Sequence, residues 1–329
     1  MKTLVLNSQD LETLKDSSAL NVAMKDSLMQ LSAGRAKNYN RHVVDISENA
    51  AMGFMPSTYL KGNLIGFKAV SVFAENKKQG LNPHQGFVVL LNSENGTVRA
   101  ILDGSTITAL RTAAVSAVAT EKLSRIDSST LAIIGAGRQA LEHALAISKI
   151  RPIKRIIFFN RTESNAEKLA QKYFKNFEVV VTSSPKRAVQ DADIVVTCTS
   201  SQNPLFSTDD LRPGTHVNTI GACRPGFREI EFKDRSELKI YLDSTAACMS
   251  EASELIQPMA IGQLSSVFIR GELGDCLNSN VLGRFHGSEI TVFKSVGLGI
   301  QDLFAANYFF REAQKKGLGA QISFGAHNE

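Results

Sequence analysis

A short apolar run that ends in a glycine-rich turn constrains the fold of this 329-residue chain more than any other feature. Residues 131–134 read Leu-Ala-Ile-Ile, and residues 135–140 follow as Gly-Ala-Gly-Arg-Gln-Ala before a helix-forming stretch. This order is typical of the strand, turn and helix start of a dinucleotide-binding unit in its G-x-G-x-x-A form. Gly135 would permit the tight turn, Gly137 would let a diphosphate approach the backbone, and Ala140 would keep helix and strand close. The expected cofactor contacts at this helix N-terminus are Gly135, Ala136, Gly137, Arg138 and Gln139.

The turn alone is also compatible with an ordinary strand-to-helix connection, so the end of the next strand matters. Residues 155–159 predict a buried strand, and Asn160, Arg161 and Thr162 follow it, 25 positions and more after Gly135. An NAD-binding unit usually carries an acidic residue about 20 positions on, where it holds the ribose 2′-hydroxyl. An amide, a guanidinium and a hydroxyl can instead accept a 2′-phosphate without repelling it. This trio predicts NADPH as cofactor, with NADH still possible and a solvated Arg161 as the alternative.

The periodicity from residue 130 onward predicts a parallel sheet covered on both faces. Strand-like segments at 130–134, 155–159, 178–181, 194–198 and 216–220 alternate with helical segments at 138–149, 163–174 and 185–190, and residues 239–242 add a further strand. The predicted fold class is α/β, a Rossmann-type doubly wound sheet. After Glu251 we expect helices with glycine breaks, and a last long helix over residues 291–316 with a small-residue patch at 297–299.

The segment before this sheet has a different pattern and predicts a separate α+β domain. Residues 4–6 predict a short strand, Ser8 a helix cap, and two helical patterns run to about Ala33. Strand-like segments at 51–55, 64–73, 86–91 and 98–102 include an Asn95-Gly96 turn signal, and Asp103-Gly104-Ser105 precedes a helix at 106–124. We expect the last helix to return here, because a cofactor cleft needs walls from both domains. The predicted domains are residues 1–112 with 300–329, and residues 113–299.

Composition excludes several other classes of protein. The chain is 43% hydrophobic and 21% charged with a net charge of +5 and no block of like charges, which predicts a diffuse field suited to anionic metabolites and no nucleic-acid partner. No apolar stretch approaches about 20 residues, and the N-terminus becomes polar too early for a signal peptide. The four cysteines are scattered and the six histidines occur singly. We therefore expect a reduced cytoplasmic protein without a membrane partner or a metal site.

Few side chains outside the nucleotide unit are suited to chemistry. Lys68 interrupts an apolar strand, where it is either a functional ammonium or a snorkelling side chain at the core edge. Arg111 is a lone cation in a small-residue helix, so its guanidinium either binds a substrate carboxylate or lies on the helix surface. Arg41 offers a second carboxylate ligand or a solvated loop arginine. His84 is either a proton donor at a strand entrance or a turn histidine without a catalytic role.

Together these pieces resemble the ornithine cyclodeaminase/mu-crystallin family over most of the chain. The segments that carry the resemblance are Gly53-Phe54-Met55-Pro56, Lys68 in its strand, Pro83-His84-Gln85, residues 103–114, the turn at 135–140, Asn160-Arg161-Thr162, Gly214-Thr215-His216-Val217-Asn218, Gly221, Arg224-Pro225, Gly271-Glu272-Leu273-Gly274 and Thr291-Val292-Phe293-Lys294-Ser295.

The resemblance implies an arrangement that the residues alone do not give. It implies a first domain that is completed by the C-terminal helix, and a Rossmann domain that lies between these two parts along the chain. It also implies a homodimer formed through the first domain's sheet. It also implies that Arg41, Lys68 and Arg111 meet the substrate's carboxylate and reacting centre. Further cofactor contacts expected on this basis are Thr112, Thr197, Thr199, Gly221 and Ser295.

Two positions favour one branch of the family over the other. Cyclodeaminases look to carry a glutamate before the Met-Pro of the early strand and an aspartate after the glycine of the N-x-x-G segment; here these positions hold Gly53 and Cys223. Loss of those carboxylates argues against ornithine cyclisation. Gly53, the Asn160-Arg161-Thr162 turn and Arg224-Pro225 look more like mu-crystallin, whose relatives are NADPH-dependent ketimine reductases.

The predicted function is therefore an NADPH-dependent reduction of small cyclic imino acids such as Δ1-pyrroline-2-carboxylate or Δ1-piperideine-2-carboxylate. A ketimine carboxylate protonates readily to an iminium that accepts hydride, so carboxylate clamps and alignment suffice. The alternatives are an amino-acid dehydrogenase or an iminosuccinate-type or opine-type reductase, a cyclodeaminase on the same scaffold, and a protein that binds NADPH and a small ligand without turnover.

Overall fold

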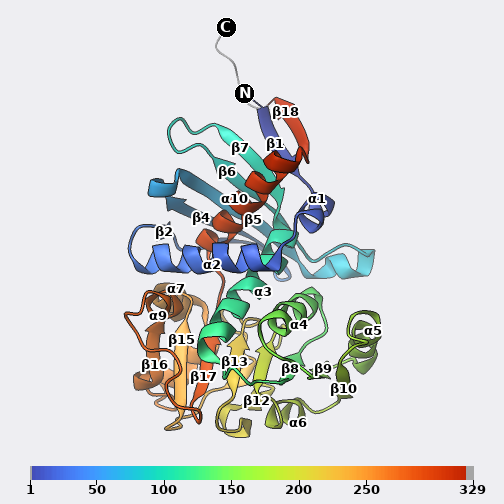
Figure 1. The fold of residues 1–329 in the computed structure, drawn as a ribbon, viewed down its shortest axis with the longest axis vertical. Helices are drawn as coiled ribbons and strands as arrows, with labels where there is room; N and C mark the ends of the chain where they lie inside the picture. The colour runs from blue at the N-terminus through green and yellow to red at the C-terminus, as the bar shows by residue number, and fades with distance from the viewer. Residues whose placement is uncertain (1, 324–329) are drawn as a thin grey trace. The chain divides into compact units, whose positions relative to one another are not determined.

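The chain folds into two compact units, which the structure, a computed structural model, describes over residues 2–323 (Figure 1). The first unit ends at Arg111 and resumes at Leu298, and the second is Thr112–Gly297. These boundaries fall one and two residues from those expected from the sequence. The first lies inside α3 (Gly104–Leu123), which begins in one unit and ends in the other.

The first unit is built on a mixed sheet with strand order β18-β1-β7-β6-β5-β4-β2, and β3 pairs with β4 outside this path. All neighbours are antiparallel except β1 and β7. The strands are β1 (Lys2–Leu6), β2 (Lys37–Asn38), β3 (His42–Ser47), β4 (Ala50–Tyr59), β5 (Leu64–Phe73), β6 (His84–Leu91), β7 (Val98–Asp103) and β18 (Ala320–Ser323). The helices are α1 (Ser8–Thr13), α2 (Ser17–Ser32), the start of α3, and α10 (Gly299–Lys316).

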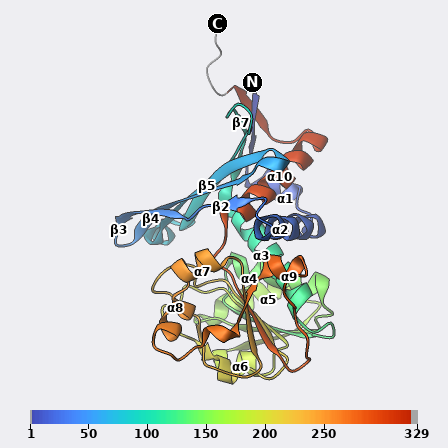
Figure 2. The same ribbon diagram turned by 90° about the vertical axis from the view of Figure 1, so that its left-hand side faces the viewer.

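Helix α10 is the core element of this unit, as the sequence predicted for the C-terminal helix. It packs on β4, β5 and β6 and against α2 (Figures 1 and 2). Its first turn touches the sheet backbone, since a Cβ on Gly299 would lie 2.7 Å from the Met55 carbonyl oxygen. The small residue at this position therefore brings the first turn of α10 onto the middle of the sheet.

Local capping and turn signals were mostly confirmed. Gly96 has φ of 72° in the β6–β7 hairpin, and Asp103 accepts a 2.7 Å hydrogen bond from the Thr106 amide at the start of α3. The cap predicted at Ser8 was wrong by one residue. Asn7 caps α1, because its side chain accepts a 3.0 Å bond from the Asp10 amide.

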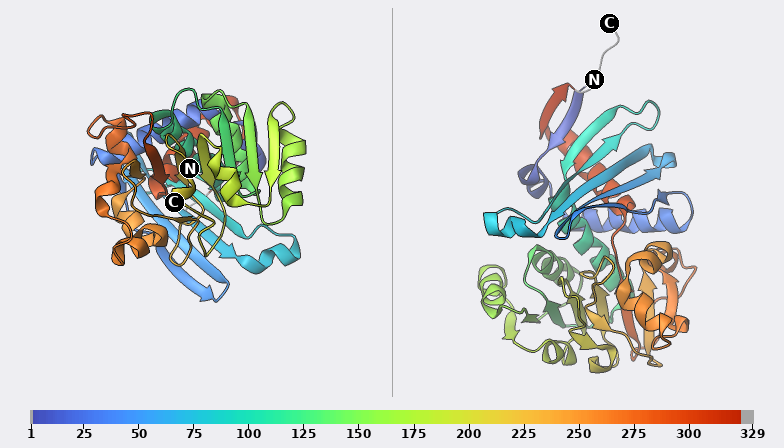
Figure 3. Two further views of the ribbon diagram at one scale, coloured as in Figure 1. Left: turned by 90° about the horizontal axis from the view of Figure 1, so that it is seen from below. Right: turned by 180° about the vertical axis from the view of Figure 1, so that it is seen from behind.

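The second unit is an eight-stranded, wholly parallel sheet of order β10-β9-β8-β11-β13-β17-β15-β16, which confirms the predicted doubly wound fold (Figure 3). Side chains of α4 and α5 form a buried cluster with Leu131 and Ile133 of β8. The strands are β8 (Thr130–Ile134), β9 (Arg155–Phe159), β10 (Glu178–Thr182), β11 (Ile194–Thr197), β13 (His216–Thr219), β15 (Leu238–Leu242), β16 (Ile269–Glu272) and β17 (Ile290–Lys294). The helices are α4 (Arg138–Ile150), α5 (Glu163–Tyr173), α6 (Pro185–Gln190), α7 (Thr245–Glu251), α8 (Ser253–Ala260) and α9 (Leu273–Leu277).

The long helix predicted over residues 291–316 was wrong in its first part. Residues 290–294 form β17, which lies between β13 and β15, and the helix starts only at Gly299. Every residue of β17 is buried, and the β-branched and aromatic residues Thr291, Val292 and Phe293 suit a strand covered on both faces. The segment after Glu251 likewise includes β16, and a separate pair, β12 (Phe206–Ser207) with β14 (Ile230–Glu231), was not anticipated.

Candidate active site and nucleotide-binding turn

Lys68 lies on β5 beneath α10 and is almost fully buried. Its Nζ atom is 2.8 Å from Asp302 Oδ2 of α10 and 3.4 Å from Thr108 Oγ1 of α3. Burial lowers the pKa of Lys68 to about 8, and the charges of Arg111 and Arg41 act in the same direction. Asp302 opposes them by favouring the ammonium form. The pKa of Lys68 therefore lies close to neutral pH, where a general acid works best.

Arg111 lies on α3 and shares its carboxylate partner with Lys68. Its Nε atom is 3.0 Å from Asp302 Oδ1, and its Nη1 atom donates to Gln301 Oε1 at 2.8 Å. Burial disfavours a charged Asp302, but Arg111 and Lys68 hold the pKa of this carboxyl below its ordinary value. One ionised carboxylate therefore bridges the two expected site cations.

Arg41 belongs to the same group, whereas His84 does not. Arg41 lies between β2 and β3, and its positive charge contributes to the low pKa of Lys68. A Cβ on Gly53 would lie 3.8 Å from Arg41 Cδ, so the residue at this position lies directly against the arginine. His84 pairs with Val72, four residues beyond Lys68 on β5, or about 13 Å along the strand. Its exposed side chain was expected near the reacting centre, and this placement does not support that role.

Sequence reasoning missed Gln301 and Asp302, although a signal existed. They are adjacent polar residues in the apolar stretch 296–306, and both are fully buried. Gln301 Oε1 accepts bonds from Arg111 and from the Leu298 amide, which fixes the orientation of its amide group. Within residues 2–323, Gln301 Nε2 is buried without an acceptor. A buried donor left this way costs about 1–3 kcal/mol unless a ligand supplies the acceptor.

The charges in this cluster do not balance. Two buried cations, Lys68 and Arg111, share one carboxylate, Asp302, and the positive charge of Arg41 also acts on Lys68. Burying a charge is unfavourable unless it is paired, so two cations that share one counter-charge favour binding of an additional anion. The guanidinium forks match the geometry of a carboxylate. Chemically, the cluster can hold a carboxylate and present an ammonium proton beside it.

In the second unit, the turn between β8 and α4 has two glycines with different roles. Gly135 has φ of 128°, and a Cβ there would lie 3.0 Å from the Cys198 carbonyl oxygen, so this position requires glycine. Gly137 precedes α4 without a side-chain cap, and a Cβ on it would meet no heavy atom of the described chain within 4 Å. Protein packing therefore does not require glycine at position 137. An uncapped helix N-terminus is a favourable place for an anionic group, which is what the sequence leads us to expect here.

The two glycines give a matched pair of predictions. Gly137→Ala should change the free energy of unfolding by no more than about 1 kcal/mol, as expected for a cap substitution. If the diphosphate binds at this turn as the sequence predicts, the same variant should weaken nucleotide binding at least about tenfold, because the added methyl group would lie in its space. Gly135→Ala should instead destabilise the fold by about 1–3 kcal/mol, because of its strained backbone. Thermal melts and fluorescence titrations with NADPH and with NADH measure both quantities; unchanged affinity for both nucleotides in Gly137→Ala would contradict this assignment.

The residues near this turn that were expected to contact the cofactor differ in their exposure and in their partners within the chain. Arg138 forms an ion pair with Glu142 one turn along α4 and stays half exposed. At the end of β9, Asn160 donates a 2.8 Å bond to the Thr162 carbonyl, while Arg161 and Thr162 are exposed. The chain therefore presents an amide, a guanidinium and a hydroxyl at this strand end, as the sequence predicted.

Glu229, which sequence reasoning missed, organises the loops after β11 and β13. This fully buried carboxylate accepts bonds from the Thr197 hydroxyl at 2.7 Å, the Thr199 amide at 2.5 Å and the Gly221 amide at 2.8 Å. A Cβ on Gly221 would lie 2.2 Å from the Thr199 carbonyl oxygen, so the two loops require glycine at this contact. Thr197, Thr199 and Gly221 were expected to contact the cofactor, and their hydrogen bonds to Glu229 fix the conformation of these two loops.

Two of the hydroxyl groups that were expected to contact the cofactor instead hydrogen-bond to carboxylates of their own unit. Thr197 bonds to Glu229, and the Ser295 hydroxyl donates to Asp243 Oδ2 at 2.7 Å. Both side chains are buried, as is Thr112 on α3. This placement favours a role for Thr197 and Ser295 in holding loops rather than in direct contact with a ligand.

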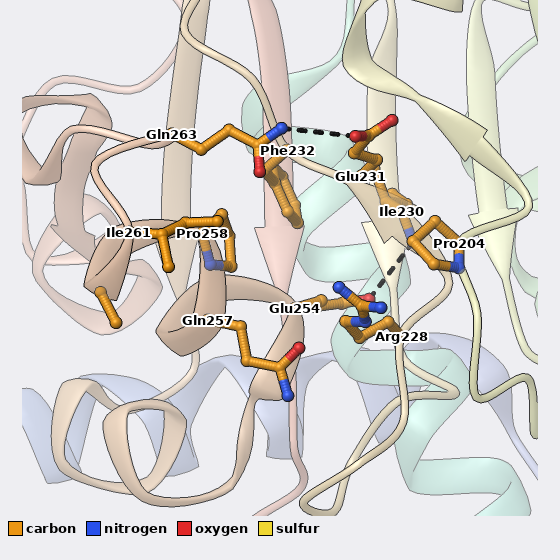
Figure 4. Close-up of a pocket in the computed structure, with 11 residues that line it drawn as sticks. Pro204, Arg228, Ile230, Glu231, Phe232, Glu254, Gln257, Pro258, Ile261 and Gln263 are labelled. Carbon is orange, nitrogen blue, oxygen red and sulfur yellow. Dashed lines mark hydrogen bonds between the residues drawn. The ribbon is translucent and has the colours of Figure 1, made fainter.

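A groove of about 660 Å³ lies elsewhere on the second unit, between β14 and α8 (Figure 4). Its lining includes none of the residues expected at the site. The buried carboxylate of Glu254 reaches this groove, but it already binds the Lys294 ammonium at 2.7 Å, the Thr219 hydroxyl and the Glu229 amide. The Glu254 carboxylate is therefore already engaged by groups of its own unit.

Comparison with known proteins identifies the family. Residues 1–317 match the model of the ornithine cyclodeaminase/mu-crystallin family. The chain belongs to this family. A relative, Delta(1)-pyrroline-2-carboxylate reductase of Bacillus cereus (strain ATCC 10987 / NRS 248), is 37% identical over 280 residues, which cover 84% of this chain and 86% of that protein.

Two further members of the family show the same extent of similarity. The ketimine reductase mu-crystallin of Mus musculus is 34% identical over 271 residues, covering 82% of this chain and 83% of that protein. The structure of Thermococcus litoralis Delta(1)-pyrroline-2-carboxylate reductase in complex with NADH and L-proline superposes with a TM-score of 0.92. That protein is 31% identical, and the match covers 97% of this chain and 100% of that one. The family resemblance drawn from the sequence is thereby confirmed.

No helix within residues 2–323 has the length and apolar character needed to cross a membrane. In the same residues, no group of three or more His, Cys, Asp or Glu side chains is arranged to hold a metal ion.

Proposed function

We propose that the protein is an NADPH-dependent reductase of small cyclic imino acids, which converts a ketimine carboxylate into the corresponding amino acid. The observation that carries this proposal is the buried pair of cations, Lys68 and Arg111, that share the Asp302 carboxylate, with the positive charge of Arg41 also acting on Lys68. The names of the relatives from Bacillus cereus and Mus musculus support the same reaction class. In this proposal the first unit binds the substrate and the second binds the cofactor.

The arginines hold the substrate carboxylate. The Arg111 guanidinium is fixed by Asp302 and Gln301, so its orientation is set before the substrate arrives. Arg41 supplies a second cation from the segment before β3. A rigid fork loses little entropy on binding, and it fixes the substrate plane with respect to Lys68.

Lys68 supplies the proton. Its ammonium group donates to the imine nitrogen, which makes the neighbouring carbon electron-poor and leaves Lys68 as a neutral amine. A bound reduced nicotinamide supplies the hydride that completes the reduction at that carbon. The new C–H bond leaves a neutral amine, and Lys68 regains its proton from solvent. The low pKa of Lys68 makes this proton transfer less uphill than transfer from an ordinary lysine.

The preference for NADPH rests on the end of β9. Asn160→Asp should lower the ratio of kcat/KM with NADPH to that with NADH by about 10–100-fold, because a carboxylate repels the 2′-phosphate and accepts bonds from ribose hydroxyls. Steady-state kinetics with both cofactors measure the ratio. Asn95→Asp, which adds the same charge to the hairpin of the first unit, should leave it unchanged. An unaltered ratio in Asn160→Asp would show that this strand end does not read the phosphate.

A substrate panel tests the reaction itself. NADPH consumption is followed with Δ1-pyrroline-2-carboxylate and Δ1-piperideine-2-carboxylate, and in parallel with pyruvate or oxaloacetate plus ammonia. We expect turnover with the cyclic imines to exceed that with the keto acids. Turnover of keto acids alone would indicate an amino-acid dehydrogenase. Demonstrable NADPH binding without any oxidation would reject the enzyme assignment.

We also infer that the protein forms a homodimer through the sheet of the first unit. Strand β3 exposes Val43, Val44 and Ile46, and Phe87 is exposed on β6, which β5 and β4 separate from β3. Exposed apolar side chains gathered on one strand favour a protein interface there. Sedimentation velocity should give a dimer, and Val43→Asp combined with Ile46→Asp should give a monomer.

A further inference from the structure

We propose that Asp302 is a positioning residue, whose two carboxylate oxygens hold the Lys68 ammonium and the Arg111 guanidinium in register and keep Lys68 protonated until it donates. This inference rests on the proposed reduction of a cyclic imine. It assigns to α10 a role in the reaction that neither catalytic side chain can fill alone.

The geometry of Asp302 carries the argument. Oδ2 lies 2.8 Å from Lys68 Nζ and Oδ1 lies 3.0 Å from Arg111 Nε, so one rigid group sets the separation of the two cations. All three side chains are at most 4% exposed. Because β5, α3 and α10 each contribute one of them, the carboxylate fixes the relative placement of proton donor and carboxylate clamp.

A purely structural role explains the cluster less well. A buried ion pair contributes little net stability, since desolvation offsets most of the attraction. Here one carboxylate serves two buried cations, Lys68 and Arg111, so these three side chains together carry a positive charge that a substrate carboxylate can complement.

The surroundings of Lys68 identify Asp302 as its source of negative charge. The strand neighbours of Lys68 are Met55 on β4 and Val88 on β6, which carry no charge. Helix α3 adds Thr108 and Arg111, the segment before β3 adds Arg41, and α10 adds Asp302. Burial and both arginines favour the neutral amine, and Asp302 alone among these groups favours the ammonium.

The first test measures Lys68 without turnover. In protein labelled with ¹³C at the lysine Cε, NMR titration of the Lys68 signal, assigned by Lys68→Arg, should give a midpoint near pH 8. In Asp302→Asn the midpoint should fall by at least about one pH unit, because the opposite charge is lost. Asp302→Glu should return it close to the wild-type value, and Asp45→Asn, which alters an exposed carboxylate on β3, should not move it. A midpoint that is the same in wild type and Asp302→Asn would overturn the proposal.

The second test uses turnover. Reduction requires the ammonium, so kcat/KM should fall as pH rises through the Lys68 pKa, and this alkaline limb should move to lower pH in Asp302→Asn by the same shift as the NMR midpoint. Ionisation of the imine substrate is common to all variants and cancels in the comparison. Asp302→Glu should restore the limb but keep kcat/KM at least about tenfold low, because the carboxylate is displaced by a methylene group.

The outcomes separate this inference from the proposed function. An NMR midpoint that shifts as expected without imine turnover in wild type would reject the proposed function and keep the assignment of Asp302 as the charge partner. Imine turnover in wild type, with an alkaline limb that stays at the same pH in Asp302→Asn, would keep the proposed function and reject the role of Asp302. If Asp302→Asn fails to fold, Asp302→Glu decides, since unchanged kcat/KM in that variant would show that the position of the carboxylate does not matter.

Discussion

Arg111→Lys is expected to lower kcat/KM for a cyclic imino acid by about 10²–10³-fold, or about 3–4 kcal/mol of transition-state stabilisation. The substitution keeps the positive charge beside Asp302, so the buried ion pair survives and the fold should remain intact. It removes the planar fork and with it the bond to Gln301. A lysine binds a carboxylate as a point charge and does not fix its plane, so the imine is no longer held in line with Lys68.

The measurement compares kinetics and nucleotide binding in the same samples. Most of the loss should appear in KM for the imino acid, and the Kd for NADPH should stay within about twofold. Arg99→Lys is a matched control in the same unit, since the Arg99 guanidinium stacks on the Phe310 ring instead of joining the cluster. Wild-type kinetics in Arg111→Lys would remove this arginine from the site.

Lys68→Gln should reduce kcat by about 10²–10⁴-fold, the usual contribution of a general acid. The neutral amide fills similar space and still hydrogen-bonds to Asp302, which keeps Arg111 as its remaining counter-charge. Stability should nevertheless decrease, because one partner of a buried ion pair is lost. The residual activity should no longer show the alkaline limb near pH 8, because the group that titrates there is gone.

Two companion variants keep this prediction informative. Lys68→Arg retains the charge but does not deprotonate near neutral pH, so it should preserve stability and still lose turnover. Lys61→Gln, an exposed lysine in the turn before β5, should leave kcat unchanged. If Lys68→Gln kept a folded structure and wild-type kcat, the proton would have to come from another group or from water.

Both units could be predicted from the sequence because their patterns are local. The turn at 135–140 and the regular alternation after residue 130 specify a parallel sheet through short-range periodicity, and the structure follows them closely. The β6–β7 hairpin followed from Asn95-Gly96 for the same reason. These patterns did not reveal that β17 is a strand buried on both faces. Its continuous apolar run is equally compatible with a buried helix.

That single error explains why Asp302 was missed. With a helix assumed from residue 291, Gln301 and Asp302 would lie in the middle of it with no particular neighbour. The helix actually begins at Gly299, and its first turn lies against β4, so Asp302 reaches Lys68 on β5 and Gln301 reaches Arg111 on α3. Contacts of this range depend on tertiary packing, which no local propensity encodes.

The order of elements along the chain has a consequence for biosynthesis. Arg111 and Asp302 are 191 residues apart, and all of the second unit is translated between them. A nascent chain therefore carries Lys68 and Arg111 without their counter-ion, and a sheet without its covering helix, until the final segment leaves the ribosome. The doubly wound sheet is complete by then, so we expect it to fold first and the N-terminal part to mature last, against the usual direction of cotranslational folding.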